Sequence, residues 1–183
     1  MGKTYDKIDD KIRAFIEAQK MFFVATAPLS ADGHINLSPK GYDAFKILGP
    51  KEVAYLDLGG SGIETQAHVQ ENGRIIIMFC AFEGGANILR LYGKGEAVQF
   101  DDPRFPALLT EFPNYDKARA IFVINITRIQ DSCGWGVPYY EFKGDRDQLH
   151  RYVDNPDRDA DFWEEKYRSA NATSIDGLRG IKS

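Results

Sequence analysis

The 183-residue sequence predicts a mainly β protein, an antiparallel barrel with helices packed at its ends. Six or seven segments have the apolar or alternating pattern of strands, and they do not alternate regularly with helices as a doubly wound sheet requires. Aromatic residues make up 13% of the chain beside 17 glycines, which suggests short strands around a flat ligand. The length fits one domain, residues 1–183, with a barrel core at about 21–130 and a C-terminal loop and helices at 131–183.

The charge balance narrows the class of partner. With 23 Lys and Arg against 27 Asp and Glu, the formal charge is −4, which argues against nucleic acid and against an anionic membrane surface as partners. No apolar run approaches the roughly 20 residues of a membrane helix. The polar N-terminus carries no signal-peptide core, so we expect a cytoplasmic protein. Histidines and cysteines lack metal-ligand spacing, so no metal site is expected.

The first half of the chain supplies a helix and three strands. Ile8, Ile12, Phe15 and Ile16 recur at helical spacing and predict a helix over 6–18. A strand at 21–27 and a strand at 34–38 flank an Asp-Gly turn, and we expect Pro39 to end the second of them. The apolar segment 52–58 predicts a further strand.

A capping box marks the next helix. Ser61 and Glu64 fit the S-x-x-E pattern, which predicts a helix over 62–72 that stops at Gly73. Strands follow at 74–82 and 87–100. In the second of these, Gly93 and Gly95 indicate a bulge, a barrel corner or a close approach of another backbone or a ligand.

The remaining elements are a short helix, one more strand and two C-terminal helices. Asp102-Pro103 opens a helix to about residue 111, and β-branched residues predict a strand at 120–130. The two helices are predicted at 145–153 and 155–168, followed by an extended tail.

Three features carry possible binding chemistry. The run 59–62 opens a helix, where free amides and the helix dipole favour an anion, although an ordinary capped turn is the alternative and Glu64 adds a negative charge. Lys40 follows the end of a predicted strand. It either points from that strand end toward a bound anion or is an ordinary surface lysine in a turn. Arg90, in the middle of an apolar strand, requires an anionic partner.

Aromatic and glycine residues are densest at 131–140. This segment either lays its rings against a flat ligand or forms a packed loop. Cys133 lies in it, but the cations that lower a thiol pKa are sparse nearby, so nucleophilic catalysis is not expected. Cys80 is expected to be a small buried thiol.

The order of these segments resembles a known family. The matching stretches are MFFVATAPLSADGHINLSPKG (21–41), VAYLDLGGSGIETQAHVQENGRIIIMF (53–79) and ILRLYGKGEAV (88–98). Over about 21–128 the chain resembles the pyridoxamine 5′-phosphate oxidase-like FMN-binding split-barrel proteins. Its segment SCGWGVPYYEFKGDRDQL (132–149) resembles a subgroup rather than the vitamin B6 oxidase itself.

The resemblance implies a six-stranded antiparallel split barrel with peripheral helices and a homodimer that holds FMN at the subunit interface. The other subunit would cover the ring with its segment 133–139. Catalytic residues are not identified. The residues that the resemblance assigns to the cofactor are Asn36, Ser38, Lys40, Gly41, Tyr55, Asp57, Ser61, Gly62, Thr65, Arg90, Cys133, Trp135, Gly136 and Tyr139.

The chain departs from the B6 oxidase pattern at the helix start. Glu64-Thr65 stands where the oxidase has Arg-Lys, so the phosphate would depend on helix amides, Ser61, Thr65 and Lys40 or Arg90. The oxidase's substrate-binding Arg/His pattern is not evident, so its reaction is not carried over. The expected function is an FMN-dependent oxidoreductase acting on a small-molecule substrate or electron donor. The alternatives are a non-catalytic flavin- or heme-binding module and a deazaflavin-dependent reductase.

Overall fold

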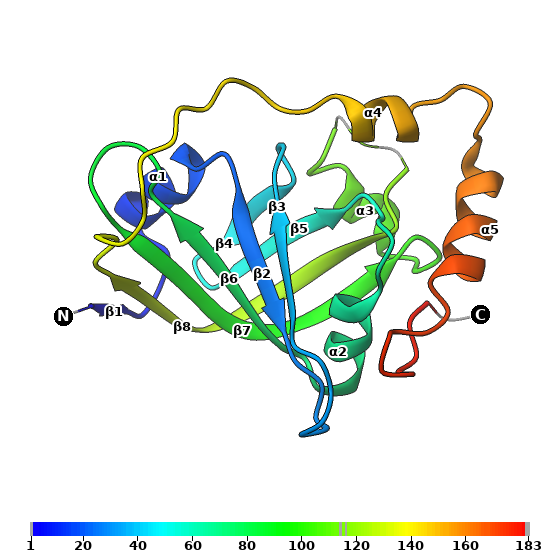
Figure 1. Cartoon of the computed structure of the whole chain (residues 1–183), viewed down its shortest axis with the longest axis horizontal. Coiled ribbons are helices and arrows are strands. Elements are labelled where there is room, and N and C mark those ends of the chain that lie inside the picture. The colour runs from blue at the N-terminus through cyan, green and yellow to red at the C-terminus, as the bar shows by residue number, and fades with distance from the viewer. Residues whose placement is uncertain (1, 114, 116, 182–183) are drawn as a thin grey trace.

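Antiparallel strands form one curled sheet in the computed structural model, which describes residues 2–113, 115 and 117–181 (Figure 1). The sheet has eight strands in the order β3-β2-β6-β7-β8-β5-β4, and β1 pairs with β8. Their bounds are β1 Thr4–Tyr5, β2 Phe22–Thr26, β3 Asn36–Lys40, β4 Phe45–Gly49, β5 Glu52–Asp57, β6 Arg74–Cys80, β7 Ile88–Gln99 and β8 Ala120–Ser132.

Aromatic contacts across the interior show how strongly the sheet curls. Three strands separate β2 from β5 in the sheet order, yet the ring of Phe22 on β2 lies 5.8 Å from that of Tyr55 on β5 and 5.2 Å from that of Phe45 on β4. The rings of Phe45 and Phe79 also meet at 5.1 Å. The sheet therefore closes around an aromatic and aliphatic core, as in a split barrel.

The first part of β8, residues 120–124, is buried on both faces, which explains why these five residues are all apolar. Phe122 and Ile124 face the barrel interior, whereas Ile121 and Val123 face a second core under α3. Beside it, Gly93 of β7 lies at a register shift, where a Cβ atom would be 2.6 Å from the carbonyl oxygen of Asn125. The predicted bulge and close approach are both present.

Helices cover the ends and one side of the barrel. Asp9 caps α1 by accepting a hydrogen bond from the Ile12 amide at 2.8 Å, and Asp159 caps α5 in the same way. Trp163 and Tyr167 of α5 form a third apolar cluster with Ile63 and Ile181. The helices are α1 Asp10–Ala18, α2 Glu64–Asn72, α3 Phe105–Leu109, α4 Gln148–Val153 and α5 Ala160–Ala170.

The predicted fold class is confirmed, and two strands, β1 and β4, are added to the six for which the sequence analysis gave ranges. β1 has two residues, too few to show a period, and β4 joins β5 through a short turn at Pro50 and Lys51. Pro39 was expected to end its strand but lies within β3 opposite Phe23. β3 is an edge strand, where the missing N–H of proline leaves no ladder bond unmade.

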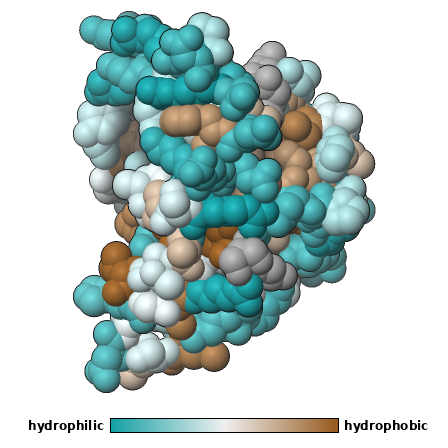
Figure 2. Space-filling model, turned by 90° about the vertical axis from the view of Figure 1, so that its right-hand side faces the viewer, coloured by the Kyte–Doolittle hydropathy of each residue, from teal (hydrophilic) through white to brown (hydrophobic). Residues whose placement is uncertain are grey.

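Residues 133–147, here called the strap, have no helix or strand and connect β8 to α4. In Figure 1 the strap runs in yellow over the top of the barrel. Figure 2 shows the side that carries the C-terminal end, where hydrophilic side chains cover most of the surface and apolar ones occupy smaller areas between them. No helix in the described ranges is long and apolar enough to cross a membrane.

Candidate functional site

A cavity of about 300 Å³ lies where β3, β5 and the start of α2 meet, and it is called the turn cavity below. The turn that gives it this name, residues 59–62, joins β5 to α2. Most of the predicted cofactor contacts line it: Asn36, Ser38, Lys40, Tyr55, Asp57, Ser61, Gly62 and Thr65. Gly60, Glu64 and Arg119 complete the lining.

Strand register places the β3 contacts in this cavity. Asn36, Ser38 and Lys40 alternate along β3 and pair with Thr26, Val24 and Phe22, all of which are buried. Side chains of directly paired residues lie on the same face of a sheet, so the three β3 side chains face inward.

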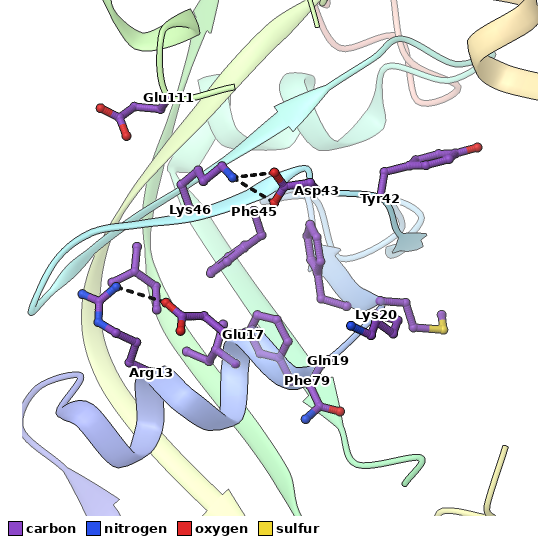
Figure 3. A pocket seen from close by; sticks show the side chains of 14 residues that line it. Arg13, Glu17, Gln19, Lys20, Tyr42, Asp43, Phe45, Lys46, Phe79 and Glu111 are labelled. Atoms are coloured by element: carbon purple, nitrogen blue, oxygen red, sulfur yellow. Dashed lines mark hydrogen bonds and ion pairs between the residues drawn. The ribbon is translucent and has the colours of Figure 1, made fainter. Parts of the chain in front are cut away.

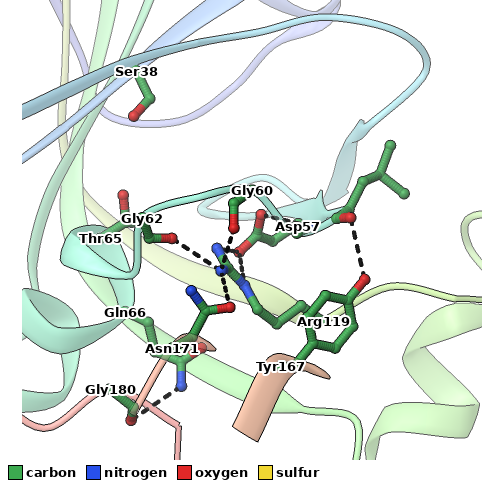
Figure 4. A network of polar contacts seen from close by, with 12 residues as sticks. Ser38, Asp57, Gly60, Gly62, Thr65, Gln66, Arg119, Tyr167, Asn171 and Gly180 are labelled. Carbon is green, nitrogen blue, oxygen red and sulfur yellow. Dashed lines mark hydrogen bonds and ion pairs between the residues drawn. The ribbon is translucent and has the colours of Figure 1, made fainter. Parts of the chain in front are cut away.

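Arg119 and Asp57 form a buried ion pair at the base of the turn cavity (Figure 4). Arg119 Nη2 lies 2.7 Å from Asp57 Oδ2, and both side chains are only 5% exposed. Arg119 Nη1 donates to the Gly62 carbonyl at 2.9 Å, to the Gly60 carbonyl at 3.4 Å and to Asn171 Oδ1 at 2.8 Å. Arg119 therefore fixes the turn and neutralises Asp57, and little of its hydrogen-bonding capacity is left for a ligand.

Lys40 is the more accessible cation of the turn cavity. Its ammonium lies 3.9 Å from Asp57 Oδ1, and its side chain is 28% exposed. Burial alone would raise the pKa of Asp57, but Arg119, Lys40 and the hydrogen bonds from Arg119 and the Gly59 amide outweigh it and lower the pKa. Asp57 is thus held as a carboxylate.

The predicted capping box at α2 is wrong. The helix begins at Glu64 with Ile63 as its N-cap, and among the described residues no side chain accepts a hydrogen bond at that N-cap. The Glu64 carboxylate accepts a hydrogen bond from the Ile175 amide of the C-terminal tail, 3.3 Å away, and Ser61 lines the cavity. The start of α2 therefore has no side-chain cap among the described residues, although the Glu64 carboxylate lies close to Gly62. Amides at a helix start and the helix dipole favour a negative acceptor.

Polar side chains that line the turn cavity form a chain of hydrogen bonds. Asn36 Nδ2 donates to Thr65 Oγ1 at 2.8 Å, and Ser38 Oγ donates to Asn36 Oδ1 at 3.3 Å. Tyr55 is fully buried, its ring stacks on Phe122 at 4.8 Å, and its hydroxyl has no hydrogen-bond partner within the described part of the chain. Burial raises the Tyr55 pKa well above its ordinary value, so this hydroxyl keeps its proton and can donate a hydrogen bond to an acceptor.

Backbone geometry at the turn depends on Gly59. Its φ of +77° lies in the left-handed region, and a Cβ atom there would come within 2.6 Å of the Tyr167 ring. The Tyr167 hydroxyl donates to the carbonyl oxygens of Leu58 and Lys117. The C-terminal helix α5 thereby packs directly against the turn.

The sequence matches a known family profile. The pyridoxamine 5′-phosphate oxidase family profile matches residues 8–133, more than half of the chain. The chain belongs to the pyridoxamine 5′-phosphate oxidase family. A member from Aspergillus flavus, the pyridoxamine 5′-phosphate oxidase family protein ustO, is 34% identical over 195 aligned residues, which cover 98% of this chain and 78% of the relative.

Solved structures share the fold. HupZ from Group A Streptococcus has a TM-score of 0.54 at 24% identity, covering 67% of this chain and 91% of the HupZ chain. An FMN-binding protein from Syntrophomonas wolfei has a TM-score of 0.50 at 16% identity, covering 65% of this chain and 82% of that protein. At these identities the likeness extends to the fold of this family member and no further.

The other predicted cofactor contacts of this family member lie outside the turn cavity. Arg90 is on the face of β7 opposite the buried Leu89 and Leu91, and its Nη1 donates to Ser132 Oγ at 2.8 Å. Gly41 lines a neighbouring cavity beneath the strap. The structure therefore does not bring the following residues into the turn cavity of the same chain: Gly41, Arg90, Cys133, Trp135, Gly136 and Tyr139.

Arg119 and Asn171 were not anticipated. Arg119 lies 62 residues from Asp57 and Asn171 lies 52 residues from Arg119, so no local pattern connects them. The available signal was an arginine placed directly before the long apolar strand β8, which in a folded chain needs a buried acceptor.

A separate cavity of about 320 Å³ opens between α1 and β4 (Figure 3). Phe22, Phe45 and Phe79 are among the residues that line it. Two ion pairs also line it: Arg13–Glu17 at 3.4 Å and Lys46–Asp43 at 2.7 Å. These charges are matched with one another, which makes this cavity a poorer candidate for an anion than the turn cavity.

Proposed function

We propose that this chain binds FMN and catalyses the oxidation or reduction of a small molecule. The observation that carries the proposal is the turn cavity, where an uncapped helix start, Lys40 and several hydroxyl groups surround a space open to an anion. Membership of the family and the shared fold with an FMN-binding protein from Syntrophomonas wolfei support it.

The residues of the turn cavity fit a flavin phosphate. The α2 amides, Ser61, Thr65 and Lys40 would hold it, since all are donors to phosphate oxygens. Two carboxylates line the cavity as well. Asp57 is neutralised by Arg119, whereas Glu64 only accepts a hydrogen bond from a backbone amide of the C-terminal tail, so its carboxylate counts against the phosphate. The unpartnered hydroxyl of Tyr55 would donate to a buried oxygen of the cofactor.

FMN, when bound, supplies hydride and electron transfer. The chain's own contribution is to bind and orient. Arg119 holds the turn at Gly60 and Gly62 so that the α2 amides keep their direction. The stacked rings of Tyr55 and Phe122 form an apolar wall that excludes water from that side.

A homodimer is part of the proposal. Trp135 is 87% exposed, and Tyr139 also projects from the strap into solvent. Large exposed aromatic side chains of this kind are typical of surfaces that cover a ligand or a partner. We expect the segment 133–139 and Arg90 of one protomer to approach the flavin of the other.

Flavin titration tests the proposal. Quenching of FMN fluorescence should report binding to the purified chain, and Lys40→Ala should weaken it about 10- to 100-fold, the loss of one charge-assisted contact. Lys51→Ala, a change at an exposed lysine of the β4–β5 turn, is the matched control and should bind as the unaltered chain does. Uptake of a deazaflavin or of heme in preference to FMN would contradict the choice of cofactor.

Reduction separates an enzyme from a carrier. Bound FMN should be reduced by a nicotinamide donor and reoxidised by an acceptor, both followed at the flavin absorption band. A flavin that is bound but that neither a donor reduces nor an acceptor oxidises would contradict the catalytic role while leaving the binding role intact.

A further inference from the structure

A cavity of about 630 Å³ lies under the strap, next to the turn cavity, and is called the strap cavity here. Its walls come from the end of α1, the turn after β3, the loop after β6 and strap residues 140–146. This volume is in the range of small-molecule sites in proteins.

Aromatic rings from three separate parts of the chain line the strap cavity. Tyr42 comes from the turn after β3, Phe82 from the loop after β6, and Tyr140 and Phe142 from the strap. The rings of Phe82 and Tyr140 lie 5.5 Å apart. Such faces contact planar rings over a large area with little loss of side-chain freedom.

Hydrogen bonds hold the strap in place over this cavity. The Tyr140 amide donates to the Phe82 carbonyl at 3.0 Å, and the Phe142 amide donates to Glu83 Oε1 at 3.3 Å. At the far end of the segment, the Tyr42 hydroxyl donates to the Arg146 carbonyl at 2.8 Å. The outer wall is therefore tied to the barrel at both ends.

Tyr42 has a strained backbone at this position. Its φ is +60°, the left-handed region that bulky residues rarely adopt. Its bond to Arg146 and an edge-on contact with His150 of α4 at 4.9 Å keep it there. Strain maintained by surrounding contacts is typical of residues that shape a binding site.

Charge selects the class of ligand. Positive and negative side chains around the strap cavity are equal in number, and one of the cations, Lys20, already lies 5.9 Å above the Phe142 ring. Recognition consequently depends on the aromatic walls rather than on a net charge. The charged lining residues are Lys20, Lys40, Arg146, Glu83, Glu141 and Asp145.

From this geometry we infer that the strap cavity binds an uncharged, planar aromatic molecule. Lys40 lines both the strap cavity and the turn cavity, so the two spaces adjoin. A molecule in the strap cavity would therefore lie beside the bound flavin and be its substrate. That last step rests on the proposed function, whereas the aromatic site itself does not.

The test uses 2-naphthol, measured by isothermal titration calorimetry on the full chain with and without FMN. We expect Phe142→Ala and Tyr140→Ala each to weaken 2-naphthol binding about tenfold, while cyclohexanol and naphthalene-2-sulfonate bind less tightly than 2-naphthol. Phe162→Ala is the matched control, because Phe162 is 40% exposed, close to the 45% of Phe142, and does not line the cavity. In the FMN-loaded protein, 2-naphthol should also shift the flavin absorption band.

The outcomes separate the two proposals. If FMN binds but 2-naphthol does not, or if Phe142→Ala and Tyr140→Ala fold and bind it as the unaltered chain does, the inference is overturned and the proposed function stands. Tighter binding of naphthalene-2-sulfonate would overturn the uncharged class. If 2-naphthol binds and is lost in both variants while FMN never binds, the aromatic site stands and the proposed function fails.

Discussion

The turn cavity and the strap are held in place by different kinds of contact. Around the turn cavity, buried polar groups fix one another: Arg119 alone contacts Asp57, Asn171 and two turn carbonyls. The strap has no helix or strand, exposes Trp135, and is held by a few hydrogen bonds. Buried charges must be matched wherever they lie, whereas an exposed aromatic segment is free to serve a ligand or a partner.

Breaking the buried ion pair should give the largest effect. Arg119→Met removes the main partner of the buried Asp57 carboxylate and leaves only the more distant Lys40 beside it, so we expect the free energy of unfolding to fall by about 3–5 kcal/mol. Urea unfolding followed by circular dichroism measures this. FMN affinity should fall as well, because the turn loses its support at Gly60 and Gly62.

Two companion variants sharpen that result. Arg104→Met removes a guanidinium whose ion pairs with Glu96 and Asp102 are solvent-exposed, and it should lower the free energy of unfolding by roughly 0–1 kcal/mol. The double change Asp57→Leu with Arg119→Met removes both buried charges and should recover much of the lost stability. Equal effects of Arg119→Met and Arg104→Met would contradict the account of the buried pair.

Acid should remove the contribution of Asp57 to the stability of the folded chain within a defined pH range. The pKa of Asp57 is lower in the folded chain than in the unfolded chain, where it is about 3.9. Its contribution to stability is therefore complete above pH 4 to 5 and is lost as the pH falls through the pKa of the folded chain. The contribution amounts to about 1.4 kcal/mol for each pH unit by which folding lowers the pKa.

Asp57→Asn isolates this contribution from those of the other carboxylates. Unfolding free energies measured between pH 6 and pH 2.5 should fall less steeply for the variant than for the unaltered chain. Parallel curves would show that Asp57 does not carry the acid sensitivity.

The smallest effect on stability is expected in the strap. Trp135→Ser should change the free energy of unfolding by less than about 0.5 kcal/mol, because the side chain is already in solvent. If Trp135 covers the flavin of a second protomer, FMN affinity should nevertheless fall. Leu29→Ser, at another exposed apolar residue that does not line the turn cavity, serves as the control, and equal FMN affinity in both variants would remove Trp135 from the proposed cover.

Much of the fold follows from local patterns in the sequence. The strand at 120–130 is recognisable because β-branched residues recur along it, and Gly73 ends α2 in the left-handed conformation as its position predicts. The short strands β1 and β4 escaped the pattern because their pairing with β8 and β5 determines them. The capping box failed because the N-cap is Ile63 rather than Ser61, and the Glu64 carboxylate instead accepts a hydrogen bond from the distant Ile175 amide.

The sequence by itself determined the mainly β fold class and the helix start after a glycine-rich turn, because these depend on periodicity and on turn chemistry, which act over a few neighbouring residues. Most residues of the turn cavity were implied by the resemblance to the family and not by a local pattern. Only the tertiary structure decided that Arg119 and Asn171 support the turn, that Arg90 faces away from it, and that the strap encloses a second cavity. Those arrangements join segments far apart in the chain, and they arise because buried charges and rings find partners only once the sheet has curled.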